Sequence, residues 1–447
     1  MSSVQYVHND ERIDCVEEKS RDGGERLLHY VWLHRMWQPA VLKTTDGRDI
    51  QIINTGRINV HAGPDFFNAT VRIADTIWVG NIEIHYNSSD WYGHGHHTDS
   101  RYNNVVLHVC KHADKDVYTQ ERHLIPQIEI SVPEYVQSNY QQLINELEYP
   151  PCYRILSNIN GITLRGWIDR MCFERMESKT ARIETYLQEN KNDWERTFFI
   201  ALSRAFGFGV NAEVFERWAM SIPLNSIAHH RDNEFQVEAF FFGQAGMLED
   251  DKIKQSDTYF QNLKSEYDFL RNKFNLLPID YKAWKFLRMR PQNFPTIRLA
   301  QLAMLYVKGA LSFSTILEAD GIKSLTKLLT TGVSSYWKTH YVFGKESTPS
   351  TKQIQKASIQ RLILNAICPV LFAYGRYSGK DELTERAFNL LEKFPAEDDR
   401  IVRRWGELGI KAENAADSQA LIHMYNAYCQ RKDCLRCIIG REYLKKV

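Results

Sequence analysis

The sequence lacks the features of a secreted or membrane-embedded protein. Its first twenty residues are polar and acidic, with no basic start and no apolar segment, so we expect no signal peptide. No apolar run reaches the length needed to cross a bilayer, and we expect no membrane partner. Only eight of the 447 residues are cysteine, which indicates reduced thiols or metal ligands rather than a disulfide framework. These absences together predict a cytoplasmic protein.

The sequence also carries almost no net charge, but this balance conceals two different parts. The formal net charge is +1, yet residues 1–150 hold 13 Lys and Arg against 21 Asp and Glu, and 11 of the 15 histidines precede residue 124. The remaining residues are mildly basic, which suits either a polyanion such as DNA or RNA or an ordinary helical surface. The absence of a long Lys/Arg tract disfavours tight general binding to DNA.

Two or three domains are expected for a chain of this length, and the apolar periodicity changes at Pro150-Pro151. Before that break the sequence predicts a helix at 22–37 and strands at 66–73, 77–85, 105–110 and 127–131, which make an α+β or α/β domain over 1–150. After it, long helical patterns predict an all-α domain over 151–447, either as one body or as two subdomains that divide near residue 250.

Carboxylates and an imidazole are predicted to meet at one edge of the first domain. Side chains alternate across a strand, so Glu83 and His85 point to the same face, and Asp65 opens the preceding strand. If these two strands pair, Asp65 comes close to Glu83. Two neighbouring carboxylates repel each other and are costly to bury unless a cation lies between them. We therefore expect a metal site at Asp65 and Glu83 for Mg²⁺ or Mn²⁺, with Zn²⁺ as the alternative.

This pattern resembles the PD-(D/E)XK phosphodiesterase superfamily through Pro64-Asp65 and Glu83-Ile84-His85. The resemblance implies a restriction-endonuclease-like mixed sheet, with Asp65 and Glu83 as metal ligands and the Ile84 carbonyl as a third. It also implies that residue 85 orients or deprotonates the attacking water, and that Glu25 is an additional acid. The chain departs from the family at His85, where the superfamily carries lysine.

A loop rich in histidine and glycine follows these strands, in the segment SDWYGHGHHTDSRYNNVVLHV. Imidazole and carboxylate together suit Zn²⁺, Mn²⁺ or Fe²⁺. We expect at least one histidine of this loop to be functional, with a preference for His94 and His97 as catalytic residues over His96. His108 is expected to be a core histidine that bonds a neighbour. Before the Asp65 turn, Arg57 and Asn59 are candidates for substrate binding.

Three cysteines near the C-terminus form a second candidate site, in the segment YCQRKDCLRCIIG. The pair Cys434-x-x-Cys437 is a good chelate for Zn²⁺ or an iron–sulfur cluster, and Cys429 adds a third thiol. The fourth ligand is not local. Cys152 is the first candidate and His423 the second, while three thiols without a metal are the alternative.

Over its full length the chain also resembles an uncharacterised family of bacterial proteins of unknown function. The segments that carry this resemblance are AGPDFFNA, GNIEIH, DWYGHGHHTDSRYNNVVLHV, RPQNFPTIRLAQ and the cysteine cluster. That family brings no activity with it.

Three functions follow from these residues. The first is a divalent-metal phosphodiesterase, or nuclease, that acts on nucleic acid. The second is a metal-dependent hydrolase of a small substrate that uses the loop histidines. The third is an inactive nuclease-derived binding or scaffold protein. Three histidines that converge on one point would favour the second function over the first. The sequence predicts no oligomeric state.

Overall fold

The computed structural model describes residues 18–59, 61–249 and 257–446, with side chains described from residue 24 onward. By its internal contacts the chain divides into two compact units. The first extends to Thr163 and includes the last segment from Asn426 onward, and the second is Leu164–Tyr425. We call them the N-terminal unit and the helical unit. The last segment therefore belongs with the N-terminal unit, whereas the sequence pattern grouped it with the helical domain at 151–447.

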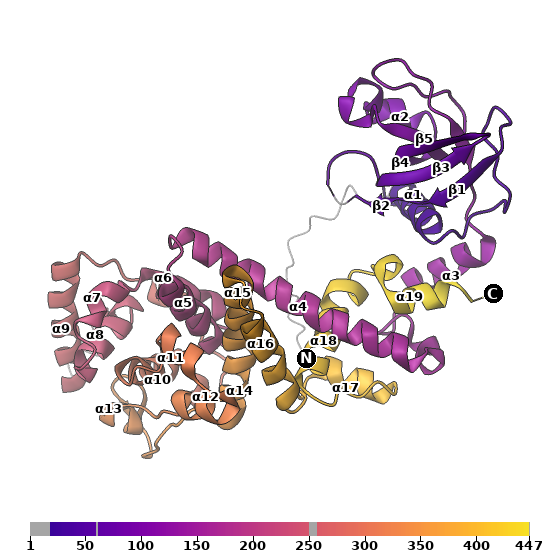
Figure 1. Cartoon of the computed structure of the whole chain (residues 1–447). Coiled ribbons are helices and arrows are strands. Elements are labelled where there is room, and N and C mark those ends of the chain that lie inside the picture. The colour runs from indigo at the N-terminus through magenta and orange to yellow at the C-terminus, as the bar shows by residue number, and fades with distance from the viewer. Residues whose placement is uncertain (1–17, 60, 250–256, 447) are drawn as a thin grey trace, which may run out of the picture. The chain divides into compact units, whose positions relative to one another are not determined.

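The N-terminal unit is built on a mixed sheet with strand order β1-β3-β4-β5-β6, and β2 pairs with β3 (Figure 1). The β1–β3, β2–β3 and β3–β4 pairs are antiparallel, while β4–β5 and β5–β6 are parallel. The strands are β1 (Ile50–Asn54), β2 (Arg57–Ile58), β3 (Phe66–Ile73), β4 (Thr76–Asn87), β5 (Val105–His112) and β6 (Gln127–Glu129). The expected mixed sheet is thus confirmed, and the four predicted strands correspond to β3, β4, β5 and β6.

Helix α1 (Glu18–Leu33) packs against this sheet and contacts β4. Its buried side chains Leu28, Val31 and Trp32 recur at helical spacing, and the Trp32 indole donates to the Thr55 carbonyl at 3.0 Å. The short helix α2 (Asp90–Gly93) and two short 3-10 turns connect β4 to β5. Helices α3 (Glu134–Asn145) and α19 (Ile438–Leu444) contact each other and close the unit (Figure 1).

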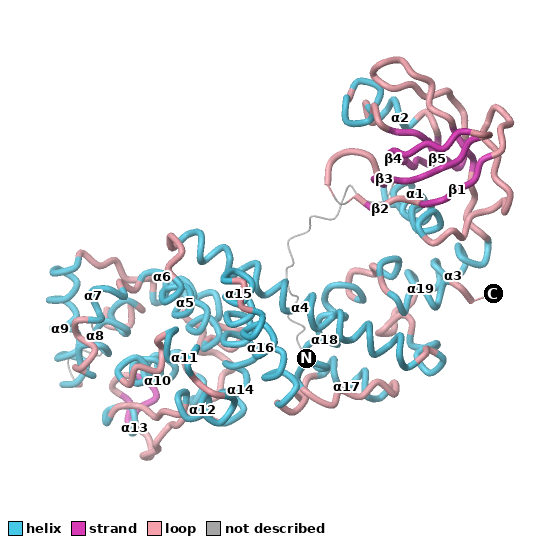
Figure 2. The backbone as a smooth tube through the Cα atoms, viewed as in Figure 1, coloured by secondary structure: helices cyan, strands magenta, loops and turns pink. Residues whose placement is uncertain are grey.

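The helical unit contains the remaining described helices, together with a short ribbon in which β7 (His340–Val342) pairs with β8 (Lys345–Glu346) (Figure 2). This confirms a larger helical part after the mixed sheet. The helices are α4 (Gly161–Glu189), α5 (Trp194–Phe206), α6 (Ala212–Ser221), α7 (Leu224–Ala228), α8 (Glu234–Gln244), α9 (Thr258–Phe274), α10 (Pro295–Val307), α11 (Phe313–Glu318), α12 (Gly321–Leu329), α13 (Ser335–Thr339), α14 (Lys356–Leu362), α15 (Cys368–Ser378), α16 (Asp381–Lys393), α17 (Arg400–Glu407) and α18 (Ala415–Met424).

One stretch of the helical unit, Lys356–Ser378, is long and apolar enough to cross a membrane by length and composition. From the sequence we expected no such stretch. It joins α14 to α15 through a π-helical segment at Ile363–Ile367, and 67% of its apolar window is buried inside the structure. Because the core helix of a folded unit meets the same two criteria, packing accounts for its apolar character.

Candidate metal centre in the N-terminal unit

Antiparallel pairing of β3 with β4 brings the two predicted carboxylates together. Phe66 pairs with Ile82, so Asp65, one residue before β3, lies beside Glu83 in β4. The Asp65 amide donates to Glu83 Oε2 at 3.0 Å, and the Ile84 amide donates to Asp65 Oδ2 at 2.9 Å. The backbone next to each carboxylate therefore donates a hydrogen bond to the other carboxylate.

Helix α1 adds a histidine and a second acid to this pair. His29 Nε2 lies 3.2 Å from Asp65 Oδ2. Burial by itself would lower the pKa of His29, but the hydrogen bond and the charge of Asp65 outweigh burial and raise that pKa. Glu25 precedes His29 by one helical turn. Burial, with a smaller contribution from the charges of Asp65 and Glu83, raises the pKa of Glu25 to about 7 although His29 opposes this. Glu25 is thus an acid that exchanges its proton near neutral pH.

Two imidazoles lie near Glu83 Oε1, and a third lies beside them. His96 Nε2 lies 3.1 Å and His85 Nε2 lies 3.7 Å from this oxygen, and His94 Nδ1 lies 3.1 Å from His85 Nε2. Within residues 18–59, 61–249 and 257–446, these three histidines form the one group of potential metal ligands whose donor atoms all lie within 4.8 Å of one another. His85 and His96 are buried and His94 is exposed, so the group is reached from the His94 side.

A chain of hydrogen bonds sets which nitrogen of His85 faces this group. Gln127 Nε2 donates to the Lys115 carbonyl at 3.0 Å, which turns Gln127 Oε1 toward His108 Nδ1 at 3.1 Å. His108 Nδ1 therefore carries the proton, and His108 Nε2 accepts from His85 Nδ1 at 2.8 Å. His85 Nε2 is left unprotonated, with its lone pair toward the other imidazoles. A metal-binding histidine needs this tautomer, and an outer hydrogen bond of this kind usually fixes it.

Burial disfavours charge on the residues of this centre. It raises the pKa of Glu83, with a further contribution from the negative charge of Asp65. It lowers the pKa of His85, where the neighbouring imidazoles add to the effect, and it lowers the pKa of His96. Burial also lowers the pKa of His108 to about 4. These imidazoles are therefore neutral, which is the form that binds a metal ion.

The donor set fits a transition metal ion better than Mg²⁺. Mg²⁺ prefers an octahedral shell of oxygen ligands, whereas one carboxylate with three imidazoles suits Zn²⁺, Mn²⁺ or Fe²⁺. Among the described side chains, His96 Nε2 is a buried polar atom without a hydrogen-bond partner, although Glu83 Oε1 is near. A buried nitrogen of this kind is costly unless it binds something. Glu83, His85, His94 and His96 thus fit a metal ion whose ligands are mainly nitrogen.

Three of the residues predicted for this site lie apart from the centre or bond elsewhere. His97 is half-buried with its ring 5.0 Å from that of Tyr92, and it is not part of the imidazole group. Its neighbour His96 takes the position that we expected for His97, because the 3-10 turn at His96–Thr98 points successive side chains in different directions. Arg57 is exposed on β2. Asn59 donates to the Pro64 carbonyl and accepts from the His61 amide, so its amide braces the loop before Asp65.

Two contributors to the centre, His29 and Gln127, were not predicted from the sequence. His29 follows Glu25 at helical spacing, which puts both on one face of α1, and this signal was present in the sequence. Gln127 carries no comparable signal, because only the parallel pairing of β5 with β6 places it opposite His108. The expectation that His108 is a core histidine bonded to a neighbour is confirmed, and its neighbour is His85.

The cysteines predicted to form a structural site are all buried, and all lie in the N-terminal unit. They are Cys152, Cys429, Cys434 and Cys437. Negative charge on Cys434 and Cys437 contributes to raising the pKa of the Cys152 thiol, after the larger effect of burial, so the thiols lie within electrostatic reach of one another. His423, the second candidate for the fourth ligand, belongs to the helical unit, where its Nε2 lies 3.8 Å from Glu174 Oε2.

Comparison with known protein families matches residues 25–400 to a family described as a protein of unknown function, DUF2851. The chain belongs to this family. Membership in an uncharacterised family was expected and is confirmed. The DUF2851 match includes all residues of the candidate metal centre and ends before Cys429. No curated protein and no solved structure matches the chain, and the likeness to the PD-(D/E)XK superfamily stays a prediction.

Proposed function

We propose that the N-terminal unit is a metal-dependent hydrolase whose ion is bound by Glu83, His85, His94 and His96. The convergence of three imidazoles, two of which lie near Glu83 Oε1, is the observation that carries this proposal. The outer chain through His108 supports it further, because it orients a ligand before any ion arrives. The proposed ion is Zn²⁺, Mn²⁺ or Fe²⁺ rather than Mg²⁺, because three of the four proposed ligands are imidazoles.

When bound, such an ion supplies a Lewis acid and lowers the pKa of a water molecule toward neutrality. The chain's own residues provide the remaining functions. Asp65 lies beside the proposed ligands and is oriented by the Ile84 amide and His29, so it is positioned to orient or deprotonate a water molecule. Glu25 lies on the same side of α1 as His29, where it can receive or return the proton.

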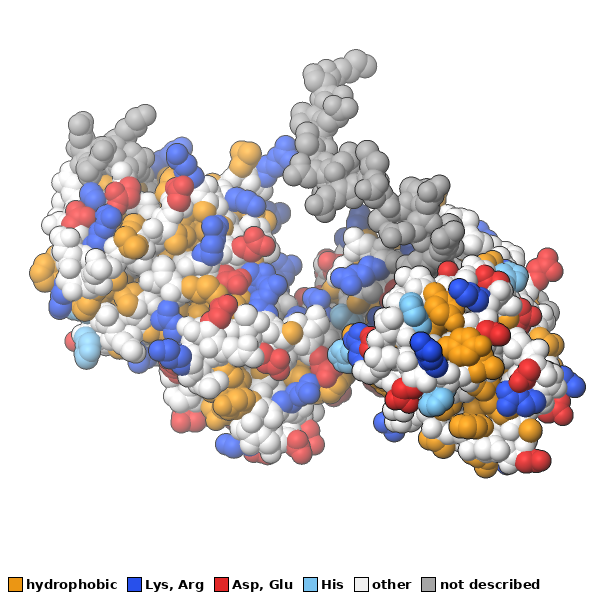
Figure 3. Space-filling model, turned by 90° about the horizontal axis from the view of Figure 1, so that it is seen from above, with side chains coloured by type: hydrophobic (Ala, Val, Ile, Leu, Met, Phe, Trp, Pro, Cys, Tyr) orange, Lys and Arg blue, Asp and Glu red, His pale blue; other side chains and the backbone are white. Residues whose placement is uncertain are grey.

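Two features of the structure support a small substrate. Three converging histidines, of which His85 and His96 are buried, favour a small substrate over a nucleic acid. On the face shown in Figure 3, Lys and Arg side chains lie among Asp and Glu side chains, which does not suggest a continuous basic track for DNA or RNA. The adjacent Asp65 and Glu83 carboxylates favour a phosphodiester as the bond to be cleaved. Hydrolysis of nucleic acid is kept as the second candidate because that carboxylate pair is the feature that resembles a nuclease.

The test uses full-length protein with added Zn²⁺ or Mn²⁺. Bis(p-nitrophenyl) phosphate is the small phosphodiester, and single- and double-stranded DNA and RNA are the polymers. We expect hydrolysis that requires metal and falls at least about 100-fold in His96→Ala and in Glu83→Gln. His97→Ala is the matched control, because it removes the adjacent imidazole outside the group, and we expect it to retain activity within about twofold.

Equal activity in His96→Ala and His97→Ala would contradict the proposed ligand set. Metal binding that depends on His96 without hydrolysis of any of these substrates would instead support the third function, an inactive binding protein. The relative rates on the small ester and on the polymers decide between the two candidate substrates.

A further inference from the structure

The last segment of the chain is anchored to the part of the N-terminal unit that precedes Cys152. Helix α19 packs against α3, and the Tyr443 hydroxyl donates to Gln142 Oε1 at 3.0 Å. The Asn139 amide donates to the Lys446 carbonyl at 2.7 Å, and the Lys432 ammonium donates to the Glu146 carbonyl. These bonds hold the C-terminal segment against α3. Cys152 lies in the short stretch of chain between the end of α3 at Asn145 and the start of α4 at Gly161.

The backbone around these cysteines is shaped to turn tightly. Cys429 ends a π-helical segment at Tyr425–Cys429, Lys432 has a left-handed φ of 55°, and Cys434 begins a 3-10 turn. Gly440 on α19 lies so close to this turn that a Cβ atom there would come within 2.1 Å of the Cys434 carbonyl oxygen. π-Helical insertions are costly in regular helices and frequently mark functional sites. The segment therefore turns sharply between its three buried cysteines, Cys429, Cys434 and Cys437.

We propose that Cys152, Cys429, Cys434 and Cys437 form a four-thiolate centre that binds zinc or an iron–sulfur cluster. All four side chains are buried, between 7 and 9% exposed. Four thiolates satisfy the complete ligand shell of either group. On binding, each thiol releases its proton to solvent and the sulfur becomes a ligand. The centre would join the end of the chain to the segment after α3, and it lies outside the hydrolase centre proposed above.

The spacing of the sulfurs bears on which group is bound. A single Zn²⁺ with Zn–S bonds of about 2.3 Å needs sulfurs about 3.8 Å apart. In the part of the chain that the structure describes, only the imidazoles of His85, His94 and His96 form a group of three or more donor atoms within 4.8 Å of one another. No three of these sulfurs are therefore that close. The wider spacing favours an iron–sulfur cluster, whose irons and sulfides lie between the thiolates.

The experiment measures metal in full-length protein purified without oxygen, in the His96→Ala background so that the hydrolase centre contributes none. Zinc and iron are measured by mass spectrometry, acid-labile sulfide by assay and the cluster by its visible absorption. We expect iron with matching sulfide, or one zinc per chain. Adding Cys437→Ser or Cys152→Ser should reduce that metal at least about tenfold. Cys110→Ser, at a buried cysteine of β5 in the same unit, should leave it unchanged.

Purified His96→Ala protein that contains neither zinc nor iron would overturn the proposal. A protein with both His96→Ala and Cys437→Ser that keeps the same metal content as His96→Ala alone would also overturn it. If the serine variants fail to fold, a mercurial reagent is titrated into the His96→Ala protein instead. Release of metal in step with modification of these thiols supports the centre, and metal that stays bound after all thiols have reacted contradicts it.

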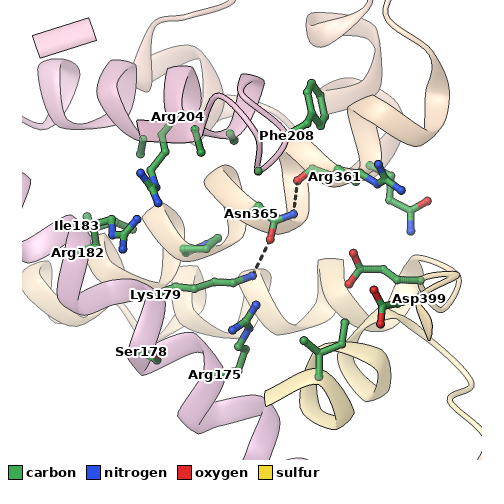
Figure 4. Close-up of a pocket in the computed structure, with 18 of the residues that line it drawn as sticks. Arg175, Ser178, Lys179, Arg182, Ile183, Arg204, Phe208, Arg361, Asn365 and Asp399 are labelled. Carbon is green, nitrogen blue, oxygen red and sulfur yellow. Dashed lines mark hydrogen bonds between the residues drawn. The ribbon is translucent and has the colours of Figure 1, made fainter. Parts of the chain in front are cut away.

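An independent observation concerns a cavity of about 880 Å³ within the helical unit (Figure 4). Arg175, Lys179 and Arg182 recur at helical spacing on α4 and contribute to one wall. Asp399 lies across the cavity from Arg182 in Figure 4. The complete set of charged lining residues is Arg175, Lys179, Arg182, Arg204, Arg361, Glu397, Asp398 and Asp399.

The cations of this cavity differ in what they bind. The Lys179 ammonium donates to the Leu364 carbonyl, Asn365 Oδ1 and Gln419 Oε1 at 3.2, 3.0 and 2.8 Å, so all its protons are used within the protein. Asn365 belongs to the π-helical segment between α14 and α15. In contrast, Arg182 and Arg361 form no ion pair with any residue that the structure describes. Two guanidinium groups therefore face the cavity without an anionic partner among those residues.

We also infer that this cavity binds a phosphate-bearing ligand through Arg182 and Arg361. Guanidinium groups bind phosphate oxygens in a two-pronged manner, which gives both strength and orientation. Asp399 lies on the Arg361 side of the cavity in Figure 4, and the acidic side chains at 397–399 suit hydroxyl or amino groups of the same ligand.

Inorganic pyrophosphate and a fluorescent single-stranded oligonucleotide are the two probes, each titrated into full-length protein at low salt. We expect binding of at least one probe, weakened about tenfold by Arg182→Ala and by Arg361→Ala. Arg170→Ala is the control, because Arg170 lies on the same helix but outside the cavity and pairs with Glu174 at 2.9 Å. Pyrophosphate binding indicates a small ligand and oligonucleotide binding alone indicates nucleic acid. Binding of neither probe, or equal affinity in Arg182→Ala and Arg170→Ala, would refute the inference.

Discussion

Gln127 offers a test of the proposed metal centre that removes none of the proposed ligands. Its side chain is 3% exposed and lies two hydrogen bonds away from the imidazole of His85. Replacing it with leucine deletes the acceptor of the His108 Nδ1 proton at 3.1 Å, so His108 and then His85 are no longer held in the ligand tautomer. Outer-shell changes of this kind cost about 10–100-fold in metal affinity, which is about 1.4–2.7 kcal/mol.

The same substitution also costs stability, and a second variant separates the two effects. Gln127 donates to the Lys115 carbonyl at 3.0 Å, and the loss of that bond leaves a buried acceptor at a cost of about 1–3 kcal/mol. Gln127→Glu cannot make that donation either, but it keeps an acceptor for His108. We therefore expect both variants to unfold at lower temperature without metal, and only Gln127→Leu to lose metal affinity.

The assay is competition for Zn²⁺ against a chromophoric chelator at a temperature at which all three proteins are folded. Wild type and Gln127→Glu should differ by no more than a few fold, while Gln127→Leu should be weaker by about 10–100-fold. Zinc affinity in Gln127→Leu equal to that of wild type would refute the argument that the chain through His108 orients His85. Equal weakening in both variants would mean that stability alone is being measured.

Further predictions concern a buried acid of the helical unit, a glycine of α19 and the proposed metal centre. Burial raises the pKa of Glu238 from 4.5 to about 7. Between these two pH values the folded protein keeps the Glu238 proton while the unfolded chain loses it. The free energy of unfolding should therefore fall by up to about 3 kcal/mol as the pH rises from about 4.5 to about 7. Thermal melts should then show Glu238→Gln gaining on wild type from about pH 5 to about pH 8, and parallel curves would contradict this. Gly440→Ala should lower the melting temperature through its clash with Cys434, whereas Gly406→Ala, which adds its methyl group to open space, should not. A chelator should lower the melting temperature of wild type more than that of His96→Ala, and equal shifts would place the stabilising metal elsewhere.

Much of the N-terminal unit could be predicted because its signals are local. Runs of β-branched and aromatic residues marked β3 and β4, and the two-residue period of a strand put Glu83 and His85 on one face. The spacing of the terminal cysteines indicated a chelate, and the change of periodicity near Pro150 separated the mixed sheet from the helices. These properties depend on residues within one or two turns of each other, where propensity and spacing decide the geometry.

The tertiary structure decided which side chains meet. Neighbouring histidines in one loop have the same chemistry, and only the course of the 3-10 turn selects His96 over His97. Gln127 orients His85 because parallel pairing of β5 with β6 sets it opposite His108, and the return of the last segment to α3 brings Cys437 toward Cys152. Such contacts join residues far apart along the chain, and they form because burial of apolar surface fixes how whole elements pack. The sequence alone therefore determined the kinds of ligand available, and the packing of strands and helices determined which of them share a site.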